Sequence, residues 1–121
     1  MKKILLIDDT LSLLDEVKDI LSMEGYEVYT ATNGFEGLEK TSTKRPDLII
    51  TDLVMPEMDG YMLVEKLKSL DKFKKVPIIV LSAQASAENI DKAMGLKIDK
   101  YLTKPCTADQ LIEAVEELTG K

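Results

Sequence analysis

Five short apolar runs, each followed by a longer amphipathic stretch, set the pattern of this chain. Three of the runs are rich in Ile, Val and Leu without polar alternation, which is typical of strands buried on both faces of a parallel sheet. Another, Tyr26–Ala31, alternates in part and suits a strand nearer the sheet edge. The predicted strands are Ile4–Ile7, Tyr26–Ala31, Leu48–Ile50, Ile78–Leu81 and Ile98–Leu102.

The stretches between these runs carry apolar residues at helical spacing. Local signals support their ends: Asn33-Gly34 is a turn signal, Thr107 is placed to cap the last helix, and Gly25, Gly95 and Gly120 follow helical stretches where a left-handed residue is favoured. The predicted helices are Leu11–Met23, Phe35–Lys40, Tyr61–Leu70, Ala87–Met94 and Ala108–Leu118, of which the second and fourth have the weaker pattern.

Strand and helix alternate five times, which predicts an α/β fold with a parallel sheet, right-handed crossovers and helices on both faces. No repeat, low-complexity segment or linker interrupts the alternation. A length of 121 residues also suits one domain. We therefore expect a single domain over residues 1–121.

Composition excludes several classes of protein. With 45% hydrophobic and 31% charged residues, the chain is not of the disordered type, and no apolar run approaches the roughly 20 residues that span a bilayer. Cys106 is the only cysteine and histidine is absent, so an intrachain disulfide, a His-ligated metal and a Ser-His-Asp triad are excluded.

The net charge of -6 argues against direct contact with nucleic acid or anionic lipid. The densest basic stretch, Lys66–Lys75, lacks interleaved aromatic residues and is interpreted as a solvated helix end. The N-terminal apolar run is too short for the core of a signal peptide. We therefore expect a cytoplasmic protein with no membrane partner.

Polar residues follow four of the five predicted strands. These are Asp8-Asp9, Thr51-Asp52, Ser82 and, after the last strand, Lys104-Pro105. Since ligands of open parallel sheets bind beyond the carboxyl ends of the strands, three carboxylates, a hydroxyl and a lysine should meet at one edge. A single Asp at a strand end is usually a cap or a turn residue, but four such features at four strand ends indicate a site.

The chemistry of this set is that of phosphoryl transfer. Clustered carboxylates repel one another unless a cation neutralises them, and oxygen ligands without His or Cys suit Mg²⁺. A lysine and a hydroxyl would bind the oxygens of a phosphoryl group, and one carboxylate would be free to act as the nucleophile.

With these residues in place, the chain resembles the response-regulator receiver domains of two-component signalling. In particular, it is similar to the single-domain regulators of chemotaxis and sporulation. The resemblance covers nearly the whole chain and implies a flavodoxin-like (βα)5 fold with strand order 2-1-3-4-5. The motifs that carry it are Ile7-Asp8-Asp9, Asp47-Leu48-Ile49-Ile50-Thr51-Asp52, Met55-Pro56-Glu57-Met58-Asp59-Gly60, Ile79-Val80-Leu81-Ser82-Ala83 and Asp99-Lys100-Tyr101-Leu102-Thr103-Lys104-Pro105.

The resemblance implies a role for each acidic residue of the set. Asp52 would be the phosphoacceptor. Asp9, Asp52 and the backbone carbonyl of Val54 would bind Mg²⁺, or Mn²⁺ in its place, and Asp8 would act through a water on the metal.

It also implies a switch. Lys104 would pair with a carboxylate at rest and with the phosphoryl group after transfer, and the Lys104-Pro105 bond would be cis. Ser82 would bind a phosphoryl oxygen and Tyr101 would change rotamer in response. Ser82 replaces the commoner Thr, and Gly95-Leu96-Lys97-Ile98-Asp99 replaces the common Gly-Ala-Asp, which leaves the identity of the output partner open.

Rival folds fit the residues less well. A haloacid-dehalogenase-like phosphatase needs Asp-x-Asp where this chain has Asp8-Asp9-Thr10, two carboxylates would repel the phosphate of FMN, and no P-loop motif is present. A receiver-like fold that works only as an unphosphorylated interaction module stays open.

The resemblance further implies a histidine kinase or histidine phosphotransfer protein as phosphodonor, and a downstream protein or a fused output domain as target. Leu11 is turned away from the apolar face of its helix yet lies beside the expected site, so Leu11, Leu13 and Pro105 are the predicted docking residues. In the family, the positions of Val54 and Gln84, each two residues beyond a site residue, influence the lifetime of the phosphoryl group. Val54 would screen the group, whereas the amide of Gln84 could reach an attacking water. We give Val54 more weight and expect a longer lifetime than in a fast chemotaxis-type receiver.

Overall fold

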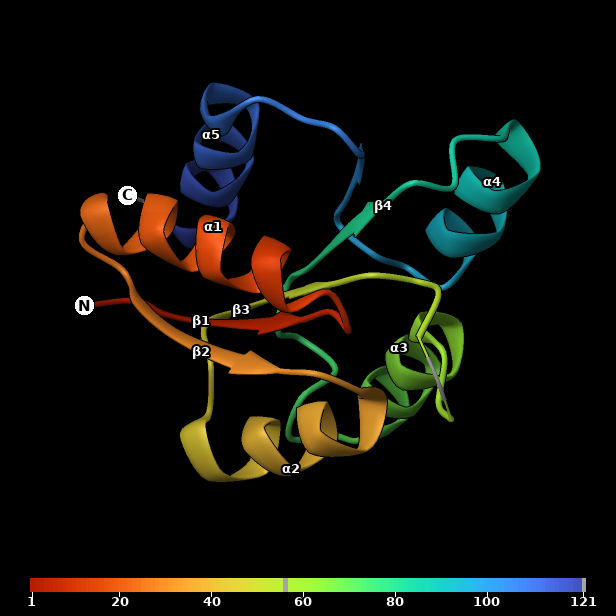
Figure 1. Ribbon diagram of the computed structural model, residues 1–121. Coiled ribbons are helices and arrows are strands. Elements are labelled where there is room, and N and C mark those ends of the chain that lie inside the picture. Colours follow the sequence, from red (N-terminus) through yellow and green to blue (C-terminus); the bar gives the residue numbers. More distant parts are fainter. Residues whose placement is uncertain (56, 121) are drawn as a thin grey trace.

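A computed structural model describes residues 1–55 and 57–120 of the chain. Strands and helices alternate along the chain (Figure 1): β1 (Lys3–Ile7), α1 (Leu11–Met23), β2 (Glu27–Ala31), α2 (Gly34–Lys44), β3 (Leu48–Thr51), α3 (Gly60–Ser69), β4 (Ile78–Ser82), α4 (Ala87–Gly95), β5 (Lys100–Thr103) and α5 (Ala108–Thr119). Pro56, part of the loop motif quoted above, lies outside the described residues.

The five strands form one parallel sheet in the order β2-β1-β3-β4-β5, which confirms the flavodoxin-like prediction. The chain begins at β1 in the interior, adds β2 on one side and then returns to add β3 to β5 on the other. The reversal of strand order between β1 and β3 opens a crevice at their carboxyl ends, where such sheets bind ligands.

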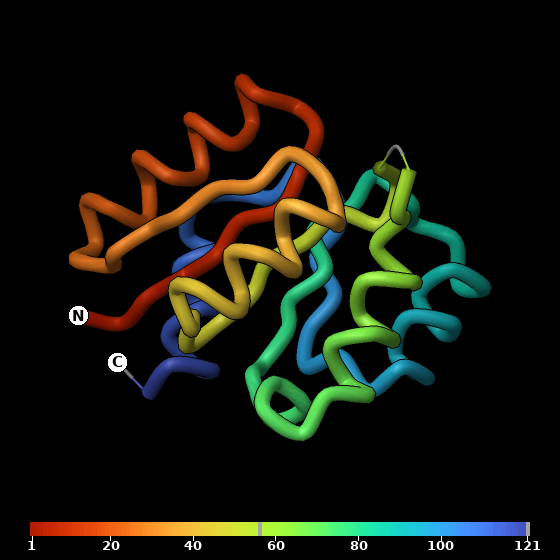
Figure 2. Tube along the Cα trace, turned by 90° about the horizontal axis from the view of Figure 1, so that it is seen from below, coloured from red at the N-terminus to blue at the C-terminus, as the bar shows by residue number. Residues whose placement is uncertain are grey.

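Side chains of successive strand residues point to opposite faces, so the sheet has two apolar cores. On one face, Ile4, Leu6 and Ile50 pack with residues of α1 and α5. On the other, Leu5, Ile7 and Ile49 pack with α3 and with Ala93 of α4. Figures 1 and 2 show the corresponding layers, with α1 and α5 on one side of the sheet and α2 and α3 on the other.

All ten predicted elements are present, and the differences lie at their ends. The helix predicted over Phe35–Lys40 extends to Lys44, because Thr41 is fully buried and the left-handed residue that ends the helix is Arg45. The last strand begins at Lys100, later than predicted: Ile98 is buried in the core but precedes the sheet pairing.

Thr107 caps α5 as predicted, with Gln110 completing a capping box. The prediction for Gly95 was wrong. It is the last residue of α4, and the left-handed conformation that follows belongs to Lys97, whereas Gly25 and Gly120 do have positive φ. Within the described residues, no helix has the length and apolarity needed to cross a membrane.

Candidate functional site

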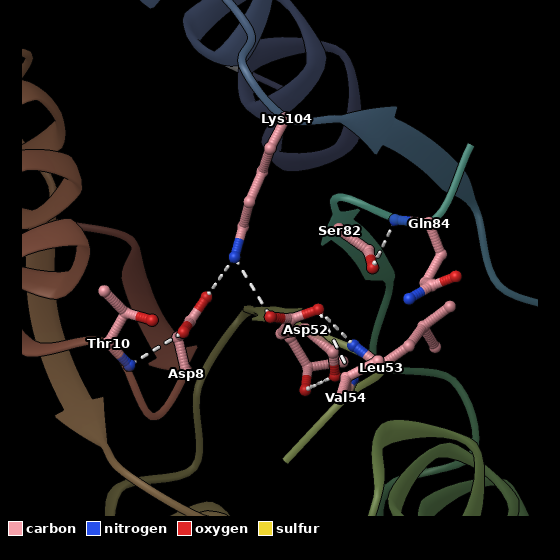
Figure 3. A network of polar contacts seen from close by, with 9 residues as sticks. Asp8, Thr10, Asp52, Leu53, Val54, Ser82, Gln84 and Lys104 are labelled. Atoms are coloured by element: carbon pink, nitrogen blue, oxygen red, sulfur yellow. Dashed lines mark hydrogen bonds and ion pairs between the residues drawn. The ribbon is translucent and has the colours of Figure 1, made fainter.

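The polar residues predicted from the strand ends meet at one edge of the sheet (Figure 3). Asp8 and Asp9 follow β1, Asp52 follows β3, Ser82 ends β4 and Lys104 follows β5. Figure 3 shows four of them, Asp8, Asp52, Ser82 and Lys104. One carboxylate oxygen from each of the three aspartates lies within 4.8 Å of the others. Asp8 and Asp52 are buried and Asp9 is exposed.

Lys104 bridges two of these carboxylates. Its Nζ lies 2.8 Å from Oδ2 of Asp8 and 3.0 Å from Oδ2 of Asp52. Burial of the ammonium group lowers its pKa, but hydrogen bonds to Asp8 and Asp52 and attraction to both charges outweigh burial, so the pKa of Lys104 is raised above its ordinary value. The lysine is therefore charged at neutral pH and holds the two carboxylates together.

The loop after β3 fixes the orientation of Asp52. Its Oδ1 accepts a hydrogen bond from the backbone N–H of Leu53 at 2.6 Å and a longer one from Val54 at 3.4 Å. The N–H of Gly60 donates to the carbonyl of Leu53 at 2.8 Å, and a Cβ at Gly60 would lie 2.1 Å from the carbonyl oxygen of Asp52. Only glycine permits this close approach of α3 to the Asp52 backbone.

Asp8 is fixed in a similar way, whereas Asp9 is not. Oδ1 of Asp8 accepts from the backbone N–H of Thr10 at 2.9 Å, and its Oδ2 accepts from Lys104. Asp9 has no hydrogen-bond or ion-pair partner within residues 1–55 and 57–120. Three carboxylates and one lysine leave a net negative charge, and all donors are hard oxygens, so the residues fit Mg²⁺ or Mn²⁺.

The opposite wall of the site carries the hydroxyl group. Ser82 is 1% exposed, and its Oγ accepts from the backbone N–H of Gln84 at 3.2 Å. The hydroxyl of Tyr101, a half-buried residue of β5, donates to the carbonyl of Gln84. Burial raises the pKa of this tyrosine, a hydrogen bond with Ser82 opposes the rise, and the nearby charge of Asp52 adds to it. Tyr101 thus already lies beside Ser82.

The model of the response regulator receiver domain family matches residues 4–116 of the chain. The chain belongs to this family.

The receiver domain covers very different shares of the proteins that it resembles. It is 34% identical over 116 residues to the protein PilG of Pseudomonas aeruginosa, covering 94% of this chain and 84% of PilG. It is 36% identical over 115 residues to the hybrid signal transduction histidine kinase D of Dictyostelium discoideum, covering 95% of this chain but 7% of the kinase. The chain spans about half or less of the length of four further curated relatives.

A solved structure is similar to this chain in both sequence and fold. The chemotaxis protein CheY4 of Vibrio cholerae superimposes with a TM-score of 0.92 at 32% identity, over 98% of each chain.

Two of the predicted docking residues are neighbours of site residues in the chain, since Leu11 comes two residues after Asp9 and Pro105 follows Lys104. Leu11, the first residue of α1, is 66% exposed, as predicted. Leu13 is half-buried against the core beneath α1 and α5, and Pro105, which follows a cis peptide bond as predicted, is exposed. Leu13 and Pro105 line a groove of about 450 Å³ between α1 and the start of α5, and Cys106 also lies in it.

Burial raises the pKa of the Cys106 thiol, so the thiol is not activated. The sequence around Cys106 likewise carries no signal for a reactive cysteine.

The two predicted lifetime residues both lie beside the site. Val54 is 58% exposed, and Gln84 is exposed at the start of the segment between β4 and α4. Sequence reasoning missed the partners of Gln84: its side chain contacts Asn89 of α4, which in turn contacts Tyr61 of α3. Tyr61 and Asn89 are 28 residues apart with no regular spacing between them, so the sequence carries no signal for this contact.

Proposed function

We propose that this receiver domain is a phosphorylation-dependent signalling switch that accepts a phosphoryl group on Asp52. The observation that carries the proposal is the position of Lys104 Nζ, within hydrogen-bond distance of both Asp8 and Asp52 in a cluster of three carboxylates. A lysine held there can exchange a carboxylate contact for a phosphoryl oxygen without moving far.

The phosphodonor in this proposal is a phosphohistidine of a histidine kinase or a histidine phosphotransfer protein. A carboxylate oxygen of Asp52 attacks phosphorus, the bond between phosphorus and the imidazole nitrogen breaks, and the leaving imidazole takes up a proton from solvent. The N–H groups of Leu53 and Val54 hold the other carboxylate oxygen of Asp52 and thereby orient the attacking one. Lys104 and the Ser82 hydroxyl bind the oxygens of the phosphoryl group.

Asp9, Asp52 and the carbonyl of Val54 would hold Mg²⁺ or Mn²⁺, with Asp8 acting less directly. The cation would offset the negative charge of the carboxylates and of the incoming phosphoryl group. The remaining parts of the proposal are that the whole chain, residues 1–121, acts as one cytoplasmic domain, and that it is not an enzyme for an external substrate. Its target would be a downstream protein or a fused output domain rather than nucleic acid or membrane.

Incubation with Mg²⁺ and acetyl phosphate, followed by mass measurement, tests the proposal. The wild type should gain one phosphoryl group and Asp52→Ala should not. Asp47→Ala, which removes an exposed aspartate away from the site, should gain it like the wild type. No gain in the wild type would favour an interaction module that works without phosphorylation.

We also propose that Val54 screens the phosphoryl group from water, because a branched apolar side chain cannot hold a water by hydrogen bonds. Val54→Asn should shorten the lifetime of the phosphorylated protein, measured as the decay of its phosphoryl signal. An unchanged or longer lifetime would remove Val54 from this role.

A further inference from the structure

A second polar network joins the segment after β4 to α3. Nδ2 of Asn89 donates to Oε1 of Gln84 at 3.2 Å, and the hydroxyl of Tyr61 donates to Oδ1 of Asn89 at 3.2 Å. The same hydroxyl lies 3.4 Å from the backbone carbonyl of Asn89. Because Gln84 also donates its backbone N–H to Ser82, the network ends at the candidate site.

Contacts with Tyr61 of α3 and with Ser86, the cap of α4, fix the position of Asn89. The Tyr61 ring packs against the apolar core between the sheet and α3, and Nζ of Lys92 lies 4.1 Å from the ring centre. Lys92 is three residues after Asn89, so both residues face Tyr61 from the same side of α4. The backbone N–H of Asn89 donates to Ser86 Oγ, the cap of α4. Both ends of the Asn89 amide are in use, which sets its orientation.

The consequence for Gln84 is that its amide oxygen is occupied. Figure 3 shows the amide nitrogen of Gln84 on the side that faces Asp52 and Val54, and the amide oxygen turned away from them. Toward the site, the side chain of Gln84 therefore offers hydrogen-bond donors and no acceptor.

We propose that Asn89, held by Tyr61, is a positioning residue that keeps Gln84 in this donor-only orientation and so slows loss of the phosphoryl group from Asp52. The inference rests on the proposed function, because it concerns the lifetime of the product of that transfer.

The hydrolysis step explains the direction of the effect. A water oxygen forms a bond to phosphorus, the bond between phosphorus and the Asp52 oxygen breaks, and a proton of the water passes to solvent, leaving inorganic phosphate and a free carboxylate. A side chain that accepts a hydrogen bond from this water orients it and strengthens it as a nucleophile, whereas a donor occupies the lone pair that must attack. With its oxygen on Asn89, Gln84 can bind phosphoryl oxygens but cannot orient the water in this way.

Decay of the phosphorylated protein tests the proposal once the phosphodonor has been removed. Asn89→Ala frees the oxygen of Gln84 and should speed decay by about threefold to tenfold, the worth of one hydrogen bond. Tyr61→Phe should have a smaller effect in the same direction. Asp91→Ala is the matched control, because it changes an exposed residue of the same helix that makes no hydrogen bond or ion pair within the described residues, and it should decay at the wild-type rate.

A Gln84→Ala background separates positioning from a general loosening of α4. The acceleration by Asn89→Ala should disappear there, because no amide remains to be released. In the unphosphorylated protein, the side-chain amide resonances of Gln84 should shift in Asn89→Ala and stay unchanged in Asp91→Ala.

The outcomes distinguish this proposal from the one it rests on. If the wild type gains no phosphoryl group, both fail. If it gains the group and Asn89→Ala decays no faster, or accelerates equally in the Gln84→Ala background, the proposed function stands and the role of Asn89 is overturned.

Discussion

The three carboxylates of the site differ in how their charge is balanced. Asp8 and Asp52 share the ammonium group of Lys104 and accept backbone N–H groups, whereas Asp9 is exposed and has no such contact within the described part of the chain. Asp9 therefore adds repulsion that no hydrogen bond or ion pair from residues 1–55 and 57–120 offsets. The unpaired negative charge of Asp9 lowers the stability of the protein without a metal, and it favours the binding of a cation.

Asp9→Asn should accordingly separate metal binding from stability. We predict that it raises the midpoint of thermal unfolding slightly without Mg²⁺, because one uncompensated charge is removed. It should also weaken Mg²⁺ binding by about tenfold or more, the usual scale for disturbing a metal site. Titration of Mg²⁺ against both proteins measures this, with Asp15→Asn, an exposed change elsewhere on α1, as the control. Equal affinities would remove Asp9 from the metal site.

For single residues, the sequence predicted the members of the site that come directly after a strand. Asp8, Asp52, Ser82 and Lys104 could be predicted to meet because parallel strands end at one edge of the sheet. The sharing of Lys104 between two carboxylates, and the contact of Asn89 with Tyr61, could not, because side-chain pairing across elements depends on rotamers and on the packing of α3 against α4.

At the scale of elements, the position of α3 depends on its first residue. A Cβ on Gly60 would meet backbone atoms of Asp52 and Leu53, the nearest at 2.1 Å, and backbone cannot move aside as a flexible side chain can. The helix that follows Asp52 therefore starts where it does because glycine allows contact with the strand end.

Substitution of two helical glycines tests this dependence. Gly60→Ala should lower the free energy of unfolding by about 1–3 kcal/mol, the cost of overpacking, and should disturb the site. Gly95→Ala, where a new Cβ meets no atom within 4 Å and φ is not positive, should raise it by about 0.5 kcal/mol. Urea unfolding measures both values. A Gly60→Ala protein as stable as the wild type would show that α3 can shift without cost.

Variants of two leucines of α1, one exposed and one buried, can distinguish the proposed docking role from packing in the core. Leu11 is 66% exposed and Leu14 is 4% exposed on the same helix. We predict that Leu11→Ala leaves stability within about 0.5 kcal/mol but slows phosphotransfer from the kinase severalfold, because an exposed apolar contact is lost. Leu14→Ala should lower stability by about 2–5 kcal/mol. If Leu11→Ala takes up phosphate at the wild-type rate, Leu11 has no part in docking.

The apolar pattern was sufficient to predict each element, because buried strands and one-sided helices leave distinct periods in a sequence. It was insufficient for the ends. Helix α2 continues past Lys40 because Thr41, a polar residue by composition, is buried and satisfied by a hydrogen bond to Gly37. The prediction that Gly95 follows its helix was wrong because Lys97 takes the left-handed conformation instead.

For the whole molecule, the layers differ in how firmly they are attached. Three buried residues of α1 and four of α5 fix one face of the sheet, whereas α4 has Ala93 as its one buried residue within the described structure. The hydrogen bonds of Asn89 and the contact of Lys92 with Tyr61 supply part of the attachment of α4. An element held by few contacts can shift between two packings at low cost, so α4 is suited to respond to the site.

We therefore predict that phosphorylation of Asp52 is transmitted through Ser82. A phosphoryl oxygen would accept a hydrogen bond from the Ser82 hydroxyl and draw it toward Asp52, which strains the bond that its Oγ now accepts from the Gln84 N–H. The segment that follows Ser82 carries the Gln84 carbonyl that accepts from the Tyr101 hydroxyl, so the shift can reach Tyr101. Amide resonances of α4, β5 and α5 should shift on phosphorylation of the wild type and of the control Ser86→Ala. Ser82→Ala should lose most of these shifts. If they persist in phosphorylated Ser82→Ala, the signal reaches α4 by another route, and Tyr101 responds to the site without the serine.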